Sequence, residues 1–169
     1  KEDNLFTEVD MTISTRLDNY LHKQNIPFNV IPHRHSNSSV GTAISAHIPL
    51  NQIAKAVILY DHEGRKLMAV LPASNRISLS KLNDELMASY QLVKEEQIAS
   101  LFNDCDFGAI PPVGQAYNMS VVFDDKLKEL DHVYIEAGDH ESLIKLSIED
   151  FMQMMKLARH TRFSREVYH

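Results

Sequence analysis

The sequence has little cysteine, no excess of cations and no long apolar run, and each shortage excludes a class of protein. A single cysteine, Cys105, cannot form an internal disulfide and is typical of a reducing compartment. No apolar run approaches the roughly 18 residues that a membrane helix needs, and no basic and apolar leader precedes the first helix. We therefore expect a cytoplasmic protein without a membrane partner.

The formal net charge of −6 argues against DNA and against non-specific binding of RNA. It does not argue against a protein that holds only one end of an RNA. The common catalytic and phosphate-binding motifs are also missing: there is no G-x-S-x-G, no G-x-x-x-x-G-K-[ST], no H-E-x-x-H and no C-x-x-C. Cys105 is a poor candidate nucleophile, because the flanking Asp104 and Asp106 disfavour its thiolate.

Histidines offer two further candidate sites, and we favour neither. His33 and His35 could supply half of a metal site, but no partner cluster with ligand spacing follows, so a solvated loop is the preferred interpretation. Asp139 and His140 are adjacent in a glycine-containing turn, where neighbouring side chains usually face different ways. We therefore expect no metal and no cofactor.

The 169 residues are enough for one domain with a substantial core, and the hydrophobic share of 44% is ordinary. Residues 11–158 are assigned to that single domain. Residues 1–10 are interpreted as an N-terminal extension, with Met11 as a candidate natural start, and residues 159–169 as a basic C-terminal tail.

Apolar spacing and capping residues predict a mixed order of helices and strands, which indicates the α+β class. Helices are expected near residues 12–25, 38–46, 80–88 and 94–102 and from 147 onward, and strands at 28–31, 53–60, 66–72, 120–123, 132–136 and 142–146. Methionines on the last helix are interpreted as core filling rather than as a ligand surface.

The strand predicted at 53–60 contains one cation, Lys55, in an otherwise apolar run. Such a run is typical of a strand covered on both faces. An unpaired buried ammonium costs several kcal/mol or more, so Lys55 must either extend past the strand end or occupy a pocket. In a pocket it would face an anionic or carbonyl-bearing ligand.

The segment from Gly108 to Gly114 carries two glycines and two prolines, Pro111 and Pro112. The glycines can adopt positive φ and allow another molecule to approach the backbone, and the prolines fix the chain. The pattern predicts a stiff loop with outward-facing amides that leads into a strand. A binding loop and a structural turn are both consistent with this composition.

Three stretches together resemble the YbaK/ProX family of free-standing aminoacyl-tRNA deacylases, which are similar to the editing domain inserted in bacterial prolyl-tRNA synthetases. They are Ile-Ala-Lys-Ala-Val-Ile-Leu around Lys55, Gly-Ala-Ile-Pro-Pro-Val-Gly from Gly108 to Gly114, and Tyr-Ile-Glu-Ala-Gly ending at Gly138. The resemblance spans about residues 14–157 in unbroken order. It implies a mixed, barrel-like β-sheet flanked by helices and the hydrolysis of wrongly charged tRNA.

The resemblance also implies roles for individual residues. Lys55 is expected at the 3′-terminal adenosine and its ester, and Gly108 at the reacting group. The aminoacyl group is expected to be bound by His33, Ser36, Ala109, Ile110, Pro111, Pro112, Gly114 and Gly138. Many family members have Thr or Ser after the lysine, where this chain has Ala56, so a hydroxyl contact is missing.

The sequence thus predicts a deacylase that edits tRNA charged with a small amino acid, with an aminoacyl-tRNA synthetase as a second candidate partner. The cations of the tail are the candidate tRNA contacts, and the alternative for this segment is a frayed, solvated terminus. These cations are Lys156, Arg159, Arg162 and Arg165. The competing hypothesis is a non-catalytic regulatory module that binds a small ligand or the aminoacylated tRNA end, which the loss of the hydroxyl at Ala56 favours.

Overall fold

The middle of the molecule is an antiparallel hairpin of two buried strands, β2 (Ile53–Tyr60) and β3 (Lys66–Pro72). Its register runs from Ala54 opposite Pro72 to Tyr60 opposite Lys66. The computed structural model describes residues 13–36, 38–106 and 108–167. Both strands were predicted, and the predictions are confirmed. Their apolar runs are continuous because both faces of the hairpin are covered.

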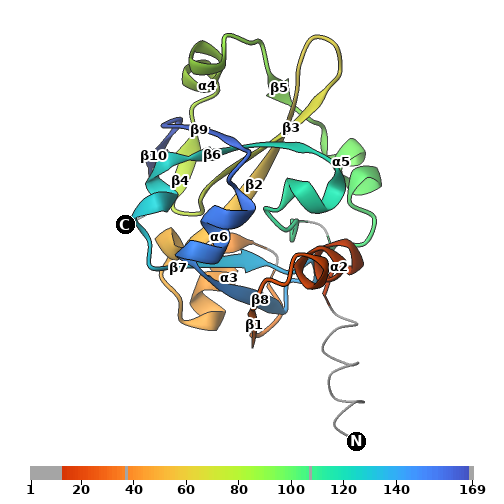
Figure 1. Cartoon of the computed structure of the whole chain (residues 1–169), viewed down its shortest axis with the longest axis vertical. Helices are drawn as coiled ribbons and strands as arrows, with labels where there is room; N and C mark the ends of the chain where they lie inside the picture. Colours follow the sequence, from red (N-terminus) through yellow and green to blue (C-terminus); the bar gives the residue numbers. More distant parts are fainter. Residues whose placement is uncertain (1–12, 37, 107, 168–169) are drawn as a thin grey trace, which may run out of the picture.

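The main sheet is mixed, with the order β1-β8-β7-β2-β3-β6-β9, and β5 pairs with β2 (Figure 1). The pairs β2–β7, β3–β6 and β6–β9 are parallel, and the other pairs are antiparallel. The remaining strands of this sheet are β1 (Asn29–Pro32), β5 (Gln91–Leu92), β6 (Ser120–Asp124), β7 (His132–Glu136), β8 (Ser142–Ser147) and β9 (Arg159–Thr161). A separate two-stranded ribbon joins β4 (Asn75–Ile77) to β10 (Ser164–Glu166).

The helices begin at the capping residues that the sequence indicates. The side-chain oxygens of Ser14, Ser38 and Ser147 each accept a hydrogen bond from a backbone N–H three residues further on. The α-helices are α2 (Thr15–Lys23), α3 (Ser39–Ala46), α4 (Leu79–Leu86), α5 (Glu95–Leu101) and α6 (Ile148–Met154), and short 3-10 helices span Leu50–Gln52 (η1), Gly114–Tyr117 (η2) and Asp125–Glu129 (η3). The α+β class, with a mixed sheet flanked by helices, is confirmed.

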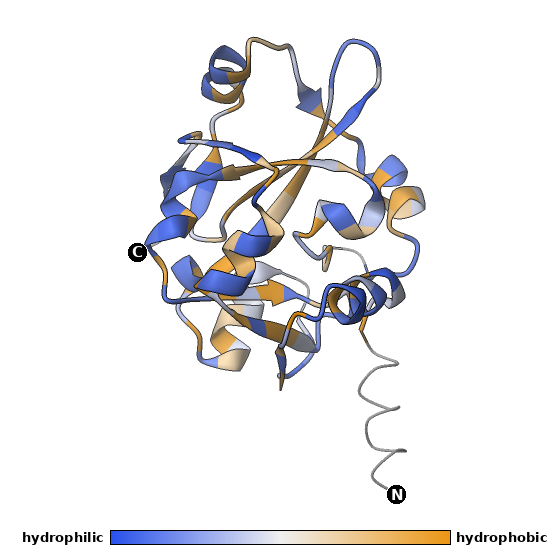
Figure 2. Ribbon diagram, in the orientation of Figure 1, coloured by the Kyte–Doolittle hydropathy of each residue, from blue (hydrophilic) through white to orange (hydrophobic). Residues whose placement is uncertain are grey.

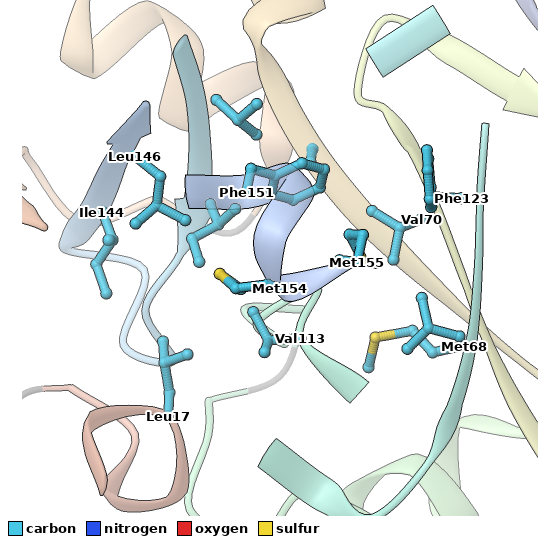
Figure 3. Packing of buried hydrophobic residues seen from close by; sticks show 14 of the residues in the cluster. Leu17, Met68, Val70, Val113, Phe123, Ile144, Leu146, Phe151, Met154 and Met155 are labelled. Carbon is cyan, nitrogen blue, oxygen red and sulfur yellow. The ribbon is translucent and has the colours of Figure 1, made fainter. Parts of the chain in front are cut away.

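The main core lies between the sheet and helix α6. Figure 3 shows Phe151, Met154 and Met155 between the β8 residues on one side and the β3 and β6 residues on the other. All three side chains are buried. Of the two methionines predicted to fill the core, Met155 is buried in it and Met152 is partly buried against it, and Met154 is a further core residue. Figure 2 shows the same division in the hydropathy, because the central strands are largely apolar whereas the helices also carry polar residues.

The C-terminal cations belong to a folded segment. β9 adds to the edge of the main sheet beside β6, and β10 pairs with β4. The carboxylate of Asp124, which is fully buried, accepts hydrogen bonds from the Phe163 N–H at 2.9 Å and from the Ser164 hydroxyl at 2.7 Å. The alternative of a frayed terminus is therefore wrong for residues 159–166. The predicted N-terminal extension and the start at Met11 lie outside the described residues.

Replacing Asp124 with Ala should lower the free energy of unfolding by about 3 kcal/mol, because the N–H groups of Lys126 and Phe163 and the Ser164 hydroxyl lose a buried charged acceptor. Denaturant unfolding would measure the change. Asp125→Ala is the matched control, since Asp125 makes only exposed contacts with Lys128 and His160 and should cost less than about 1 kcal/mol. Equal losses in the two variants would mean that Asp124 does not anchor the segment.

Candidate active site

A gap in the sheet beside β2 defines the candidate site. One edge of β2 is paired with β3 along its length. On the other edge, β7 pairs with Ile53 and Ala54, and β5 pairs with Leu59 and Tyr60. Between these two pairings, residues 55–57 have no partner strand on this second edge in the described part of the chain. The gap therefore lies beyond the carboxyl end of β7 and beside the third to fifth residues of β2.

A cleft of about 220 Å³ occupies this gap. It combines residues from β2, β7, α5, the start of α3 and the loop before η2. Its lining residues are Ser39, Lys55, Ala56, Glu95, Ile98, Gly108, Ile110 and Glu136. Five segments far apart in the sequence therefore meet in one small space, with a cation, a buried carboxyl group (Glu136), an exposed one (Glu95) and two apolar walls.

Lys55 lies at the unpaired stretch of β2 and is half-buried. Burial lowers the pKa of its ammonium below the ordinary value, and the charge of Arg76 lowers it further. Arg76, the exposed residue of ribbon strand β4, is therefore a second cation near Lys55. The apolar strand carries Lys55 to a cleft in which an anionic or carbonyl-bearing ligand would meet it.

Glu136 ends β7 and is only 3% exposed. Neither of its carboxyl oxygens has a hydrogen-bond partner among the described residues. Burial is the main cause that raises the pKa of Glu136 to about 7, and the negative charge of Asp139 raises it further. The nearby Thr42 hydroxyl partly opposes this shift, although it lacks the geometry of a hydrogen bond. The cleft thus contains a carboxyl group that titrates near neutral pH.

The loop from Gly108 contributes less to the cleft than expected. Gly108 is exposed with φ 80°, and it lines the cleft together with Ile110. The N–H of Ala109 donates to the Asp106 carbonyl at 3.1 Å, so this amide is part of a turn and does not face outward. The rest of the loop packs into the protein.

The prediction of a loop with outward-facing amides does not hold for most of this segment, which packs into the core. Ala109, Pro111, Pro112 and Val113 are buried, and Val113 belongs to the main core. Gly114 does not use positive φ. It is needed for close packing, because a Cβ there would lie 2.6 Å from Val121 and 3.0 Å from the Met119 carbonyl oxygen. The structure does not bring these predicted binding residues into the cleft lining.

A buried polar network fixes the start of the loop. Asp104 accepts hydrogen bonds from the hydroxyl of Ser14 at 2.7 Å and from the hydroxyl of Tyr117 at 3.0 Å. Burial raises the pKa of Asp104, but these bonds and the Arg16 N–H outweigh it and lower that pKa overall. The network joins α2 and η2 to the segment that leads into Gly108. It therefore holds the loop in place.

Three other predicted binding residues lie outside the cleft lining. The backbone N–H of His33 donates to Glu141, and that of Ser36 donates to His140, so both residues tie the loop after β1 to the turn before β8. Gly138 has φ 109°, and a Cβ there would lie 3.0 Å from Cβ of Ser14. Ser39, which follows the same loop, does line the cleft.

The tail cations line two separate hollows. Lys156 and Arg159 line one of about 450 Å³, and Arg162 and Arg165 line another of about 390 Å³. Neither hollow includes Lys55. Arg165 is nevertheless connected to the cleft region, because it lies directly opposite Arg76 in the β4–β10 ribbon.

Other chemistry finds no support in the described residues. Burial raises the pKa of Cys105 to about 12, and Asp104 contributes to that shift, so the thiol is not a ready nucleophile. No group of three or more His, Cys, Asp or Glu among the described residues could hold a metal ion. None of the helices described is long and apolar enough to cross a membrane.

Comparison with known proteins identifies the class. The model of the aminoacyl-tRNA editing domain matches residues 33–154, and the chain belongs to this family. No curated protein is significantly similar in sequence. Among solved structures, a hypothetical protein superposes with a TM-score of 0.79 at 17% identity, covering 89% of this chain and 99% of that one.

Two further structures share the fold. A candidate trans-editing enzyme for prolyl-tRNA synthetase has a TM-score of 0.77 at 16% identity, covering 90% of this chain and 96% of its own. A candidate signal-transduction protein from Marinobacter aquaeolei has a TM-score of 0.71 at 18% identity, with 85% of this chain covered but only 29% of its own. The family resemblance seen in the sequence is thereby confirmed.

Sequence reasoning missed Glu136 as a site residue, together with Ser39, Glu95, Ile98 and Arg76. The sequence did contain a signal for Glu136, because a charged residue in an apolar strand, like Lys55, must either reach solvent or occupy a pocket. The other four could not be found in this way, because helices and short strands carry such residues routinely.

The raised pKa of Glu136 predicts a pH-dependent stability. The folded protein keeps this proton up to about pH 7, whereas the unfolded chain loses it near 4.5. Stability should therefore fall by about 3 kcal/mol between these pH values and then level off. Glu136→Gln should remove this loss, so its stability relative to wild type should rise across the same window in denaturant titrations.

Glu141→Gln is the matched control for this titration, because Glu141 is exposed in the adjacent turn and its replacement should change stability little at any pH. A constant difference between Glu136→Gln and wild type from pH 4.5 to 8 would contradict the assigned burial of the carboxyl group.

Proposed function

We propose that this editing domain acts as a free-standing deacylase, which hydrolyses the ester of a mischarged tRNA carrying a small amino acid. The observation that carries the proposal is the cleft itself, because Lys55, Gly108 and Glu136 line one space of about 220 Å³ beside the open edge of β2. Family membership supports the tRNA substrate.

The reaction asks little of the protein beyond positioning. An aminoacyl ester is already activated, so hydrolysis needs a placed water and stabilisation of the developing oxyanion. The water oxygen bonds to the carbonyl carbon and the ester C–O bond breaks. The proton released by water goes to the departing ribose oxygen, which becomes the free terminal hydroxyl. Lys55 orients the terminal ribose or stabilises negative charge near the ester.

The size of the cleft supports a small side chain. Ile98 and Ile110 form its apolar walls, and both come from structured, packed segments. Walls of this kind distinguish one methylene by only about 1–3 kcal/mol. We therefore expect modest discrimination among alanine, serine and cysteine and poor turnover of aromatic residues.

Cations beside the cleft offer a place for phosphates despite the negative net charge. Arg76 and Arg165 are both exposed and lie directly opposite each other in the ribbon, an arrangement in which like charges repel. A phosphate between them would relieve that repulsion, and Arg76 also acts on Lys55. We extend the proposed tRNA contacts from Lys156, Arg159, Arg162 and Arg165 to Arg76, with Arg165 as the member of that set nearest to it.

A non-catalytic binding module remains the second candidate function, favoured by the missing hydroxyl at Ala56, which lines the cleft. Assays over a panel of mischarged tRNAs separate the two. Release of a free amino acid by wild-type protein supports the deacylase, and binding of the charged tRNA without release supports the module.

Lys55→Ala should lose deacylation by about a hundredfold or more while the melting temperature changes by only a few degrees, because the side chain faces a cleft and not the core. The control is Lys66→Ala, a strand lysine on β3 whose ammonium bonds to the Gly64 carbonyl. It should keep full activity. A fully active Lys55→Ala protein would remove Lys55 from the site.

Gly108→Val should abolish deacylation, since a side chain at this position would fill the cleft and block the approach of the ester to the backbone. Gly64→Val is a close control, because Gly64 also has φ 80° and a Cβ there would meet nothing within 4 Å. Both variants carry the same backbone strain of about 1–2 kcal/mol, yet only Gly108→Val should lose activity. Equal activity in both would make the loop purely structural.

A further inference from the structure

Glu136 presents a buried carboxyl group to the cleft with no partner for either oxygen among the described residues. Buried carboxylates are normally paired or accept hydrogen bonds, because an unpaired one costs several kcal/mol. Lys55 lines the same cleft but makes no ion pair with Glu136. The Thr42 hydroxyl lies near the carboxyl group without the geometry of a hydrogen bond, and the nearby Asp139 is repulsive. Stability alone would favour Gln or an apolar residue here. A buried acid kept at this cost points to a role in binding or catalysis.

The ligand group that suits this position is a small cation with N–H donors. Both carboxyl oxygens are buried in the wall of the cleft. Once the side chain turns toward the cleft, these two acceptors match an ammonium group, which offers three donors and a full positive charge. We propose that Glu136 binds the α-ammonium group of the aminoacyl moiety, an inference that rests on the proposed function. The protein would then recognise esters of free amino acids as a chemical class, apart from any preference for the side chain.

The strand register makes this arrangement consistent with the rest of the cleft. Ile53 pairs with Tyr134, and Ala54 with Ile135, so Lys55 and Glu136 are the next residues of two parallel strands at the point where they separate. Glu136 is 3% exposed, whereas Gly108, which also lines the cleft, is exposed. The acid therefore lies deep and the loop lies at the mouth.

An aminoacyl ester can bind in only one orientation if its amine is to reach the buried acid and its ribose is to remain at the exposed loop. The α-ammonium group points inward to Glu136, the side chain lies against Ile98 and Ile110, and the ribose and phosphates extend outward past Lys55 toward Arg76. The α-nitrogen is bonded to the carbon next to the ester carbonyl. Anchoring it therefore fixes the carbonyl carbon relative to Lys55 and Gly108, which lowers the entropic cost of reaching the transition state.

Two other roles for Glu136 predict different results. A general base would act on the attacking water and would be needed whatever the acyl group carries. A purely structural acid would affect folding but not the choice of substrate. A substitution in the protein combined with a substitution in the ester distinguishes the three roles.

The experiment compares alanyl-tRNA with lactyl-tRNA, which has a hydroxyl in place of the amine and the same side chain. With rates divided by the uncatalysed rates, wild-type protein should prefer the alanyl ester by about ten- to a hundredfold in kcat/KM, the worth of one charged hydrogen bond. In Glu136→Gln this preference should fall to near unity, while the rate on lactyl-tRNA stays within a few-fold of wild type.

Three results would overturn the proposal. The first is an equal loss of kcat/KM on both esters in Glu136→Gln, which indicates a general base. The second is an unchanged preference for the alanyl ester in that variant, and the third is no preference in wild-type protein. The last comparison uses wild-type protein and does not depend on the folding of a variant. Glu141→Gln, an exposed neighbour outside the cleft, should keep the wild-type preference.

Binding distinguishes failure of this proposal from failure of the proposed function. If wild-type protein hydrolyses no charged tRNA, the deacylase fails, but calorimetry with 3′-alanylamido-adenosine and its lactoylamido counterpart still tests Glu136. Tighter binding of the amine-bearing compound that disappears in Glu136→Gln supports the ammonium contact. Equal binding of the two compounds to wild-type protein overturns it.

Discussion

The covering of β2 on both faces is the constraint on which the rest of the structure depends. Its side chains alternate between two cores, so a polar group on this strand can be tolerated only where the neighbouring strand leaves. That place is residues 55–57, between the β7 and β5 pairings. The same divergence leaves Glu136 at the end of β7 facing the gap. Fold and site thus have one origin, because the separation of two parallel strands creates the cleft and supplies its charged residues.

The electrostatics of the molecule follow from this arrangement. The chain carries a net charge of −6, yet the cleft region places a cation, Lys55, between a buried acid, Glu136, and an exposed arginine, Arg76. A substrate with a positive amine at one end and phosphates at the other matches this order of charges. Local placement therefore decides compatibility with RNA here, and the total charge mainly discourages non-specific contacts.

Much of the fold could be predicted because the strong signals are local. The apolar runs of β2 and β3 and the serine caps of α2, α3 and α6 report on their own neighbourhoods. The short strands β9 and β10 were not predicted, because charged three-residue strands form only through partners such as β6 and β4. Only part of the candidate site could be predicted from the sequence. Lys55 is conspicuous in its strand, whereas Glu136 acquires meaning only through its parallel pairing with a strand about 80 residues earlier in the chain. The buried loop after Ala109 was missed because Gly and Pro content does not reveal depth.

The ribbon of β4 and β10 has a consequence for how the chain acquires its structure. Asn75 bonds to Ser164 across 89 residues of sequence, and β9 completes the sheet edge beside β6. Neither strand can form until its partner has been made, and contacts of such long sequence separation form slowly because a large loop must first be closed. The β2–β3 hairpin and β6 can therefore pair before β9 has been made, and until then one edge of β6 has no partner strand. Only when β9, about 35 residues after β6 in the chain, has been made is the β6 edge protected from pairing with another chain.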